Sequence, residues 1–374
     1  MKILVAMDSF KESMTSHEAG CAVRDGILQR YPDAEIIVRQ MSDGGEGFVD
    51  AIASCVPGER VDLEVTGPLN EPVRASYYIT SDSNTAFIES ASACGLMLID
   101  EDRRNPLYTT TYGLGELIRD AAERGVRDYV IGLGGSGTND GGAGMLQALG
   151  YRFLDSGGSD IRRGAIGLKD LKEIDDSGAM TVLKGCRFEI ASDVTNPLCG
   201  PCGASYVFAP QKGAGREDVA LMDGWMSSYA GKTALLIPDA DKDSEGSGSA
   251  GGLGFAFRTY LGGVIASGAD LVIHKTGLEE LVRNADIVIT GEGRIDSQSS
   301  MGKATVKIAR LGRRYGKRTI GIGGLIADGA VPDPANGFAE MYEVMRDSDD
   351  DYLDPSKARY NMIRTASAIN INRQ

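Results

Sequence analysis

Apolar and polar residues follow one another at the start of the chain as expected for a strand, a helix and a second strand. Residues 3–7 are an apolar run with the length of a buried strand, and residues 15–30 show helical spacing with a threonine or serine as the cap. A second apolar run at residues 35–38 leads into the glycine-rich segment 41–47. This repeated order of strand, loop and helix predicts a parallel α/β sheet.

The middle of the chain has short alternating patterns, which are typical of strands in a mixed sheet. The expected strands there are residues 61–65, 73–79 and 85–89, followed by a helix at 110–124, a buried-type strand at 129–131 and a helix from Ala143. Towards the C-terminal end, residues 285–290 and 318–322 again read as parallel-type strands that flank a helix.

These patterns predict two domains, as does the length of 374 residues, at which one hydrophobic core has usually stopped growing. Residues 1–60 and 281–374 are expected to form one flavodoxin-like or Rossmann-like α/β domain from both chain ends. Residues 61–280 are expected to form an inserted mixed α/β domain. The glycine-rich residues 241–254 are expected to be a linker or a ligand loop.

The strongest local signal is the segment 132–142, which places six glycines and several small polar residues between a strand and a helix. Glycine lets an anion approach backbone N–H groups, so this loop is a candidate phosphate cradle. A tight strand-to-helix turn that needs glycine only for its geometry is the alternative.

Residues 132–137 also satisfy the G-x-G-x-x-G pattern, and Asp155 follows about where a ribose-binding acid would be expected. An NAD(P)-dependent oxidoreductase that uses this loop is therefore one alternative function. A non-enzymatic sensor of a sugar acid is another. No hydride-transfer partner stands out near the loop, and the chain leaves no obvious room for a signalling output module.

The net charge of −14 opposes attraction to nucleic acids and to anionic membranes, because both need a basic face. We expect neither as a partner. No apolar stretch reaches the length of a membrane span, and the N-terminal segment does not resemble a signal peptide, so we expect a cytoplasmic protein. With only two histidines in the chain, a hydrolase triad is disfavoured.

Phosphoryl transfer needs a carboxylate that orients the attacking hydroxyl, oxygen ligands for magnesium, and cations near the phosphates. The chain has carboxylates and lysines in loops after predicted strands, at Asp43, Asp193, Glu292, Asp296, Lys11, Lys212 and Lys303. It lacks both the P-loop motif and the catalytic loop of protein kinases. Any phosphoryl transfer must therefore use a different fold.

Six motifs cover nearly the whole chain, at residues 8–11, 41–47, 132–142, 193–198, 211–214 and 291–298. In this order and spacing the sequence resembles the type I bacterial glycerate kinase family. The resemblance implies ATP-dependent phosphorylation of D-glycerate, most often to 2-phosphoglycerate and less often to 3-phosphoglycerate. It also implies a flavodoxin-like and a mixed α/β domain with the active site between them.

The roles of single residues are hypotheses on this basis. Asp193 is expected to orient or deprotonate the glycerate hydroxyl, while Lys11 and Lys212 offset transition-state charge. Residues expected to bind ATP or glycerate are Ser9, Gly134, Gly135, Ser136, Thr138, Asn139, Asn196 and Gln211. Residues expected to hold Mg²⁺, directly or through water, are Asp43, Glu292 and Asp296.

Overall fold

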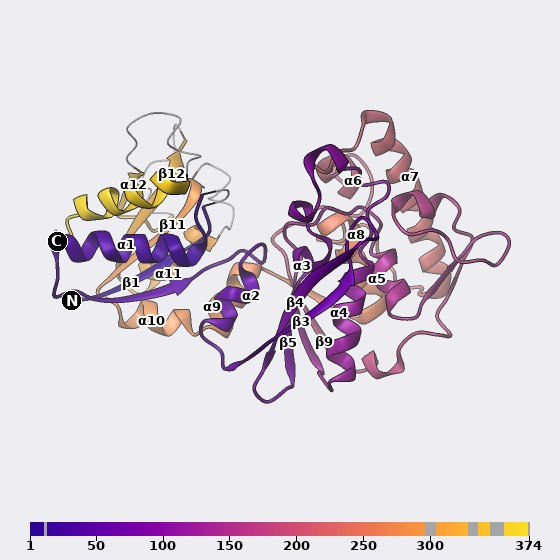
Figure 1. Ribbon diagram of the computed structural model, residues 1–374, viewed down its shortest axis with the longest axis horizontal. Helices are drawn as coiled ribbons and strands as arrows, with labels where there is room; N and C mark the ends of the chain where they lie inside the picture. The colour runs from indigo at the N-terminus through magenta and orange to yellow at the C-terminus, as the bar shows by residue number, and fades with distance from the viewer. Residues whose placement is uncertain (11–12, 296–303, 328–335, 345–354, 373–374) are drawn as a thin grey trace. The chain divides into compact units, whose positions relative to one another are not determined.

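A computed structural model describes residues 1–10, 13–295, 304–327, 336–344 and 355–372 of the chain (Figure 1). The chain divides into two compact units. Unit 1 comprises Met1–Asp43, Asp50–Val56 and Gly268–Gln374, and unit 2 comprises Gly44–Val49 and Pro57–Ser267. Both ends of the chain thus belong to unit 1, while the domain boundaries near residues 60 and 280 stay a prediction.

Unit 1 contains a five-stranded sheet in the order β13-β12-β11-β1-β2, and all of its pairs are parallel. Its strands are β1 (Lys2–Met7), β2 (Glu35–Gln40), β11 (Ile287–Ile295), β12 (Arg318–Ile326) and β13 (Glu340–Glu343). Its helices are α1 (Ser16–Arg30), α9 (Gly268–Lys275), α10 (Leu278–Asn284), α11 (Ala304–Arg314) and α12 (Pro355–Ala368), and α2 (Phe48–Ala53) begins in unit 2 and ends in unit 1. The predicted parallel sheet made from both chain ends is confirmed.

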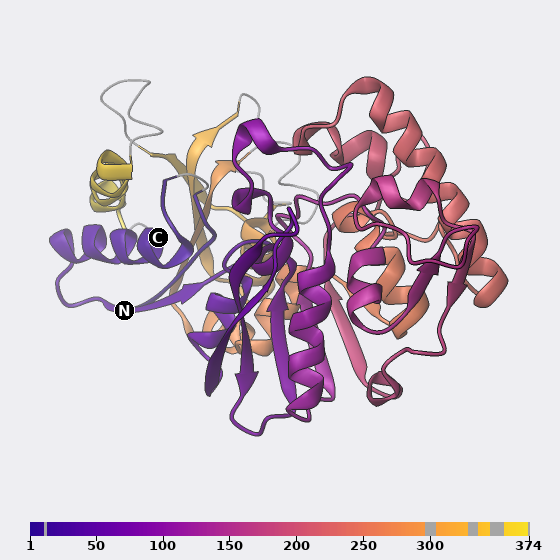
Figure 2. The same cartoon turned by 45° about the vertical axis from the view of Figure 1, so that its right-hand side comes forward.

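Apolar residues of β1 alternate between the two faces of this sheet, as the two-residue period of a strand requires. Ile3, Val5 and Met7 pack with α1 and α12 in one buried cluster. These two helices lie side by side in both views (Figures 1 and 2). Helix α1 begins after Thr15, whose hydroxyl accepts from the Glu18 N–H at 3.2 Å, so one of the two predicted cap residues is confirmed.

Unit 2 contains a six-stranded sheet in the order β10-β9-β6-β5-β4-β3 and a small β7-β8 sheet. The strands are β3 (Gly58–Thr66), β4 (Pro72–Thr80), β5 (Thr85–Glu89), β6 (Asp128–Gly132), β7 (Arg152–Leu154), β8 (Glu173–Asp175), β9 (Arg187–Ala191) and β10 (Val264–Ala266). The helices are α3 (Ser90–Cys94), α4 (Tyr112–Glu123), α5 (Ala143–Ala148), α6 (Ala204–Phe208), α7 (Arg216–Leu236) and α8 (Ser249–Leu261). Because β3-β4-β5 pair antiparallel and β5-β6-β9-β10 pair parallel, the predicted mixed sheet is confirmed.

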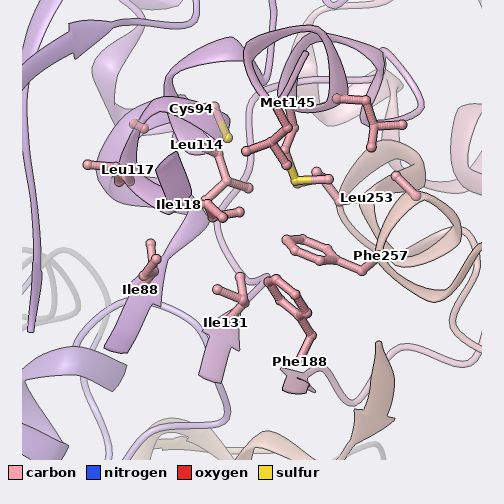
Figure 3. Packing of buried hydrophobic residues seen from close by; sticks show 14 of the residues in the cluster. Ile88, Cys94, Leu114, Leu117, Ile118, Ile131, Met145, Phe188, Leu253 and Phe257 are labelled. Carbon is pink, nitrogen blue, oxygen red and sulfur yellow. The ribbon is translucent and has the colours of Figure 1, made fainter. Parts of the chain in front are cut away.

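The core of unit 2 lies between this sheet and its helices. Figure 3 shows Ile131 and Phe188 of neighbouring strands beside Leu114 of α4 and Phe257 of α8, and all four side chains are buried. This packing fixes the strand ends from which the loops of the site depart. No helix in the described ranges is both long enough and apolar enough to cross a bilayer.

The glycine-rich residues 241–254 do not link the two units. They lie within unit 2, and α8 begins inside them at Ser249. Gly251 has a φ of +69°, and a Cβ atom there would lie 2.1 Å from the Thr138 carbonyl oxygen. The glycines therefore serve a close backbone approach rather than a flexible connection.

Candidate active site

The loops that carry the predicted site residues of unit 2 begin along one edge of its sheet. Glu89, Gly132 and Ala191 are register partners at the carboxyl ends of β5, β6 and β9. The glycine loop (residues 132–142) follows β6, and Asp193 follows β9 as an exposed residue. In α/β sheets, ligands bind outside the carboxyl ends of the strands.

Backbone hydrogen bonds hold the glycine loop on several sides. The Leu96 N–H donates to the Gly135 carbonyl oxygen at 2.8 Å, and the Gly137 N–H donates to the Cys94 carbonyl oxygen at 2.9 Å. The Gly134 N–H donates to the Gly44 carbonyl oxygen at 3.1 Å. Many N–H groups expected to bind phosphate are thus used within the protein, and the accessible part of the loop is its tip, where Gly135 is exposed.

Asp140 anchors the end of the glycine loop, a function that sequence reasoning missed. Its buried carboxylate accepts from the backbone N–H groups of Thr111, Gly142 and Gly144 at 2.9, 3.1 and 3.3 Å, and from the Thr111 hydroxyl. Burial raises the pKa of this carboxyl, and these hydrogen bonds oppose the rise. Because backbone N–H groups can only donate, the surroundings accommodate the ionised form. The signal in the sequence was an aspartate before two glycines and a helix.

Lys212 lies behind the glycine loop, in the short 3₁₀ turn Pro210–Lys212. Its ammonium donates to the Thr138 carbonyl oxygen at 2.7 Å and to the Ser136 Oγ at 3.0 Å. The side chain is only 2% exposed. Burial lowers its pKa to about 8, and the nearby Cys94 and Asp140 act in the opposite direction. The predicted role of Lys212, which is to offset charge in the transition state, therefore requires its ammonium to act from a buried position.

This lowered pKa predicts that Lys212 makes the protein less stable when it is charged. Between pH about 8 and 10.5 the unfolded chain holds the lysine proton and the folded chain does not, so raising the pH favours folding. The free energy of unfolding of the wild type, relative to Lys212→Met, should rise over this range by on the order of 3 kcal/mol. Urea unfolding at several pH values measures it, with the surface variant Lys232→Met as a pH-independent control. A difference that stays flat or falls contradicts the prediction.

The other predicted residues of unit 2 differ in exposure. Thr138 and Asn139 are completely buried, and the Asn139 Nδ2 donates to the Ser205 Oγ at 2.9 Å. The Asn196 Nδ2 donates to the Cys202 carbonyl oxygen at 2.7 Å, which closes the loop between these residues. Gln211 is exposed. Thr138 and Asn139 thus support the loop from within, whereas Gln211 and Asp193 face solvent.

The predicted residues of unit 1 that the structure describes follow strands β1 and β2 or lie within β11. The chain runs from β1 to β2 on one side and from β11 to β12 on the other, so the β1-β11 pair is the topological switch point of the sheet. The Asp8 N–H donates to the Gly291 carbonyl oxygen at 2.8 Å, which places Ser9 and Glu292 at this point. Asp43 is exposed beyond β2. Lys11, Lys303 and Asp296 lie outside the described residues.

Comparison with known proteins identifies the family. The model of the glycerate kinase family matches residues 3–371. The chain belongs to this family. A glycerate kinase of Bacillus subtilis is 46% identical, with 92% of this chain and 90% of the relative covered. A glycerate 2-kinase of Escherichia coli K12 is 43% identical, with 92% and 91% covered.

A solved structure agrees with this assignment. The crystal structure of a Salmonella typhimurium LT2 protein assigned as a glycerate kinase 2 matches with a TM-score of 0.84 at 42% identity, covering 98% of this chain and 96% of that one. The predicted family, the predicted fold class and the predicted kinase activity are confirmed. This chain is a glycerate kinase, which is a phosphotransferase, and this activity implies glycerate and ATP as its substrates.

The glycine loop does not have the geometry of a dinucleotide fingerprint. In that fingerprint the helix opens at the glycines, whereas α5 begins only at Ala143, six residues after Gly137. Asp155, the expected ribose-binding acid, accepts from the N–H groups of Gly157 and Ser159 and so closes its own turn. Both observations argue against the oxidoreductase alternative.

The acidic residues of unit 1 that are predicted to hold Mg²⁺ fit this ion chemically. Carboxylate oxygens are hard ligands, and Mg²⁺ is usually bound by one or two carboxylates together with waters and phosphate oxygens. Asp43 follows β2 and Glu292 lies in β11, and β1 separates these two strands in the sheet. In the described ranges, no three acidic, histidine or cysteine side chains converge on a metal-sized point. Contact of these residues with the ion, directly or through water, stays a prediction.

Proposed function

We propose that this glycerate kinase is a cytoplasmic enzyme that phosphorylates the 2-hydroxyl of D-glycerate, with Mg²⁺-bound ATP as donor, to give 2-phosphoglycerate and ADP. The supporting observation is the 43% identity over most of both chains to a protein named glycerate 2-kinase. Phosphorylation at the 3-hydroxyl remains the alternative product. The net charge of −14 supports small-molecule rather than nucleic-acid or membrane partners.

In the proposed reaction Asp193 accepts the proton of the glycerate hydroxyl. The hydroxyl oxygen forms a bond to the γ-phosphorus while the bond between this phosphorus and the β,γ-bridging oxygen breaks, and ADP leaves. Its exposure and its place at the carboxyl end of β9 make Asp193 accessible to a substrate. Lys11 is proposed to offset charge at the phosphates, and Lys212 contributes its charge from behind the glycine loop.

Substrate binding is proposed to use Ser9, Gln211 and the tip of the glycine loop at Gly134, Gly135 and Ser136. Asp43, Glu292 and Asp296 would hold Mg²⁺, which when bound neutralises phosphate charge and orients the transferred group. Thr138, Asn139 and Asn196 shape these loops through the contacts described above.

An ADP-release assay with D-glycerate, ATP and Mg²⁺ tests this function when the product is passed to enolase alone and, in parallel, to phosphoglycerate mutase plus enolase. Phosphoenolpyruvate from enolase alone is expected, because enolase acts on 2-phosphoglycerate. Product that appears only with the mutase would mean phosphorylation at the 3-hydroxyl. No ADP release with D-glycerate would overturn the substrate assignment.

A further inference from the structure

Ser136 is the buried polar side chain next to the exposed tip of the glycine loop. The residue is 7% exposed and follows Gly135, which is exposed. Its Oγ accepts a hydrogen bond from the Lys212 ammonium at 3.0 Å, and within the described ranges its own hydroxyl proton goes to no acceptor. A hydroxyl carries one donor and two acceptor sites, so this serine retains a donor.

The direction of that donor follows from the chemistry of Lys212. An ammonium group has three donors and no acceptor, and one of its protons is fixed by the Thr138 carbonyl oxygen at 2.7 Å. Facing an ammonium, the Ser136 hydroxyl can only accept. Its proton must therefore turn away from Lys212.

We propose that Ser136 donates a hydrogen bond to an anionic oxygen of a substrate and that Lys212 is the positioning residue that directs this donor, without itself contacting the substrate. This inference rests on the proposed function and deepens it. The anionic oxygen is either a phosphate oxygen of ATP or the carboxylate of glycerate, which share the same acceptor chemistry.

Buried groups around Lys212 maintain the arrangement. The charged or titratable groups that act on it are Asp140, in the glycine loop, and Cys94, at the end of α3. Burial raises the pKa of the Cys94 thiol to about 12, so this group stays neutral and Asp140 supplies the negative charge. The carboxylate that anchors the loop also favours the ammonium form of Lys212.

Loss of the Lys212 proton allows the hydrogen bond to reverse. A neutral amine has a lone pair, and the Ser136 hydroxyl can then donate to it and no longer to the substrate. Because burial lowers the pKa of Lys212 to about 8, this reversal should weaken anion binding above that pH. The phosphates of ATP and the carboxylate of glycerate are fully ionised there, so their own titration does not interfere.

The test compares wild type with Ser136→Ala in steady-state kinetics at about pH 7 and about pH 9.5, varying ATP and D-glycerate in turn. At the lower pH we expect Ser136→Ala to raise one KM about tenfold with little change in kcat, because a hydrogen bond to a charged group is lost from ground and transition states alike. In the wild type the same KM should rise with pH, and in Ser136→Ala it should stay constant. The substrate whose KM responds identifies the anion.

Ser228→Ala is the matched control, because the surface serine Ser228 also accepts from a lysine, Lys232, at 2.8 Å. It should behave as wild type. Binding of adenylyl imidodiphosphate and of D-glycerate, measured by calorimetry in the same proteins, gives a readout that needs no turnover. Unchanged KM and binding in Ser136→Ala, or a parallel rise of KM with pH in both proteins, would overturn the inference. Absence of ADP release by the wild type would instead overturn the proposed function.

Lys212→Met adds a second line of evidence. If Lys212 acts through Ser136, the double variant Ser136→Ala/Lys212→Met should raise the KM that responds to Ser136→Ala no more than Lys212→Met alone does. Additive effects of the two substitutions would show that Lys212 acts on the substrate independently. If Lys212→Met does not fold, the pH comparison in Ser136→Ala still decides the question.

Discussion

Asp193→Asn is expected to lower kcat about 100-fold to 10,000-fold, the usual range for loss of a general base in the transition state. Asparagine has nearly the same shape but cannot accept the hydroxyl proton of glycerate. Because Asp193 is exposed at the carboxyl end of β9, the substitution should leave the fold intact. KM for both substrates should change little, and ADP release under saturating conditions measures the effect.

Asp239→Asn is the control for this prediction, because Asp239 is an exposed aspartate of the same unit that follows helix α7 rather than a strand. It should retain wild-type kcat. A value for Asp193→Asn within about threefold of wild type would remove Asp193 from the proton-transfer step, since the smallest expected loss is far greater. The carboxylates of unit 1 would then be the next candidates.

Gly251→Ala is expected to destabilise the protein by about 2–4 kcal/mol, because a left-handed backbone strain adds to overpacking. The backbone at Gly251 has a φ of +69°, and the new methyl carbon would lie 2.1 Å from the Thr138 carbonyl oxygen and 2.7 Å from the Asn139 Cα. Since that carbonyl also binds Lys212, the displacement should disturb the glycine loop as well. Urea unfolding gives the free energy, and KM measures the loop.

Gly231→Ala is the matched control, and it is expected to stabilise the protein rather than destabilise it. Gly231 lies in α7, and no atom would come within 4 Å of a Cβ atom there. Alanine should stabilise this helix by up to about 1 kcal/mol. If Gly251→Ala lowers the free energy of unfolding by less than about 1 kcal/mol, α8 and the glycine loop can move apart more easily than their close packing indicates.

Hydrophobic periodicity predicted the elements that contact the core through many regularly spaced residues. The first strand, the first helix with its threonine cap, and the three strands of the middle segment lie within a few residues of their predicted positions. The boundaries differ because strand ends depend on pairing partners far along the chain, which a local pattern does not contain. For residues 241–254 the linker alternative is wrong for the same reason, because Gly251 in this segment approaches the Thr138 carbonyl oxygen, more than a hundred residues away. The ligand-loop alternative stays a prediction.

The motifs of the site could be predicted from the sequence, but the hydrogen bonds that connect them could not. The motif at residues 132–142 predicted Ser136 as a binding residue and contains Asp140, for which the pattern predicted no role. Their hydrogen bonds involve Lys212 and Thr111, each distant in sequence. The motifs also do not show which residues are buried in the fold. Thr138 is fully buried and Gln211 is exposed, although both belong to recognisable motifs.

The parallel pairing of β1 with β11 also sets an order of events during synthesis on the ribosome. β1 is made first, yet its partner Ile287–Ile295 leaves the ribosome only after all of unit 2 has been translated. At roughly 5–20 residues per second, this delay lasts on the order of tens of seconds. Unit 2 can therefore fold while β1 still has an unpaired edge, and edges of this kind are sites of aggregation. Nascent chains that stall before β11 should consequently be the ones that need chaperones.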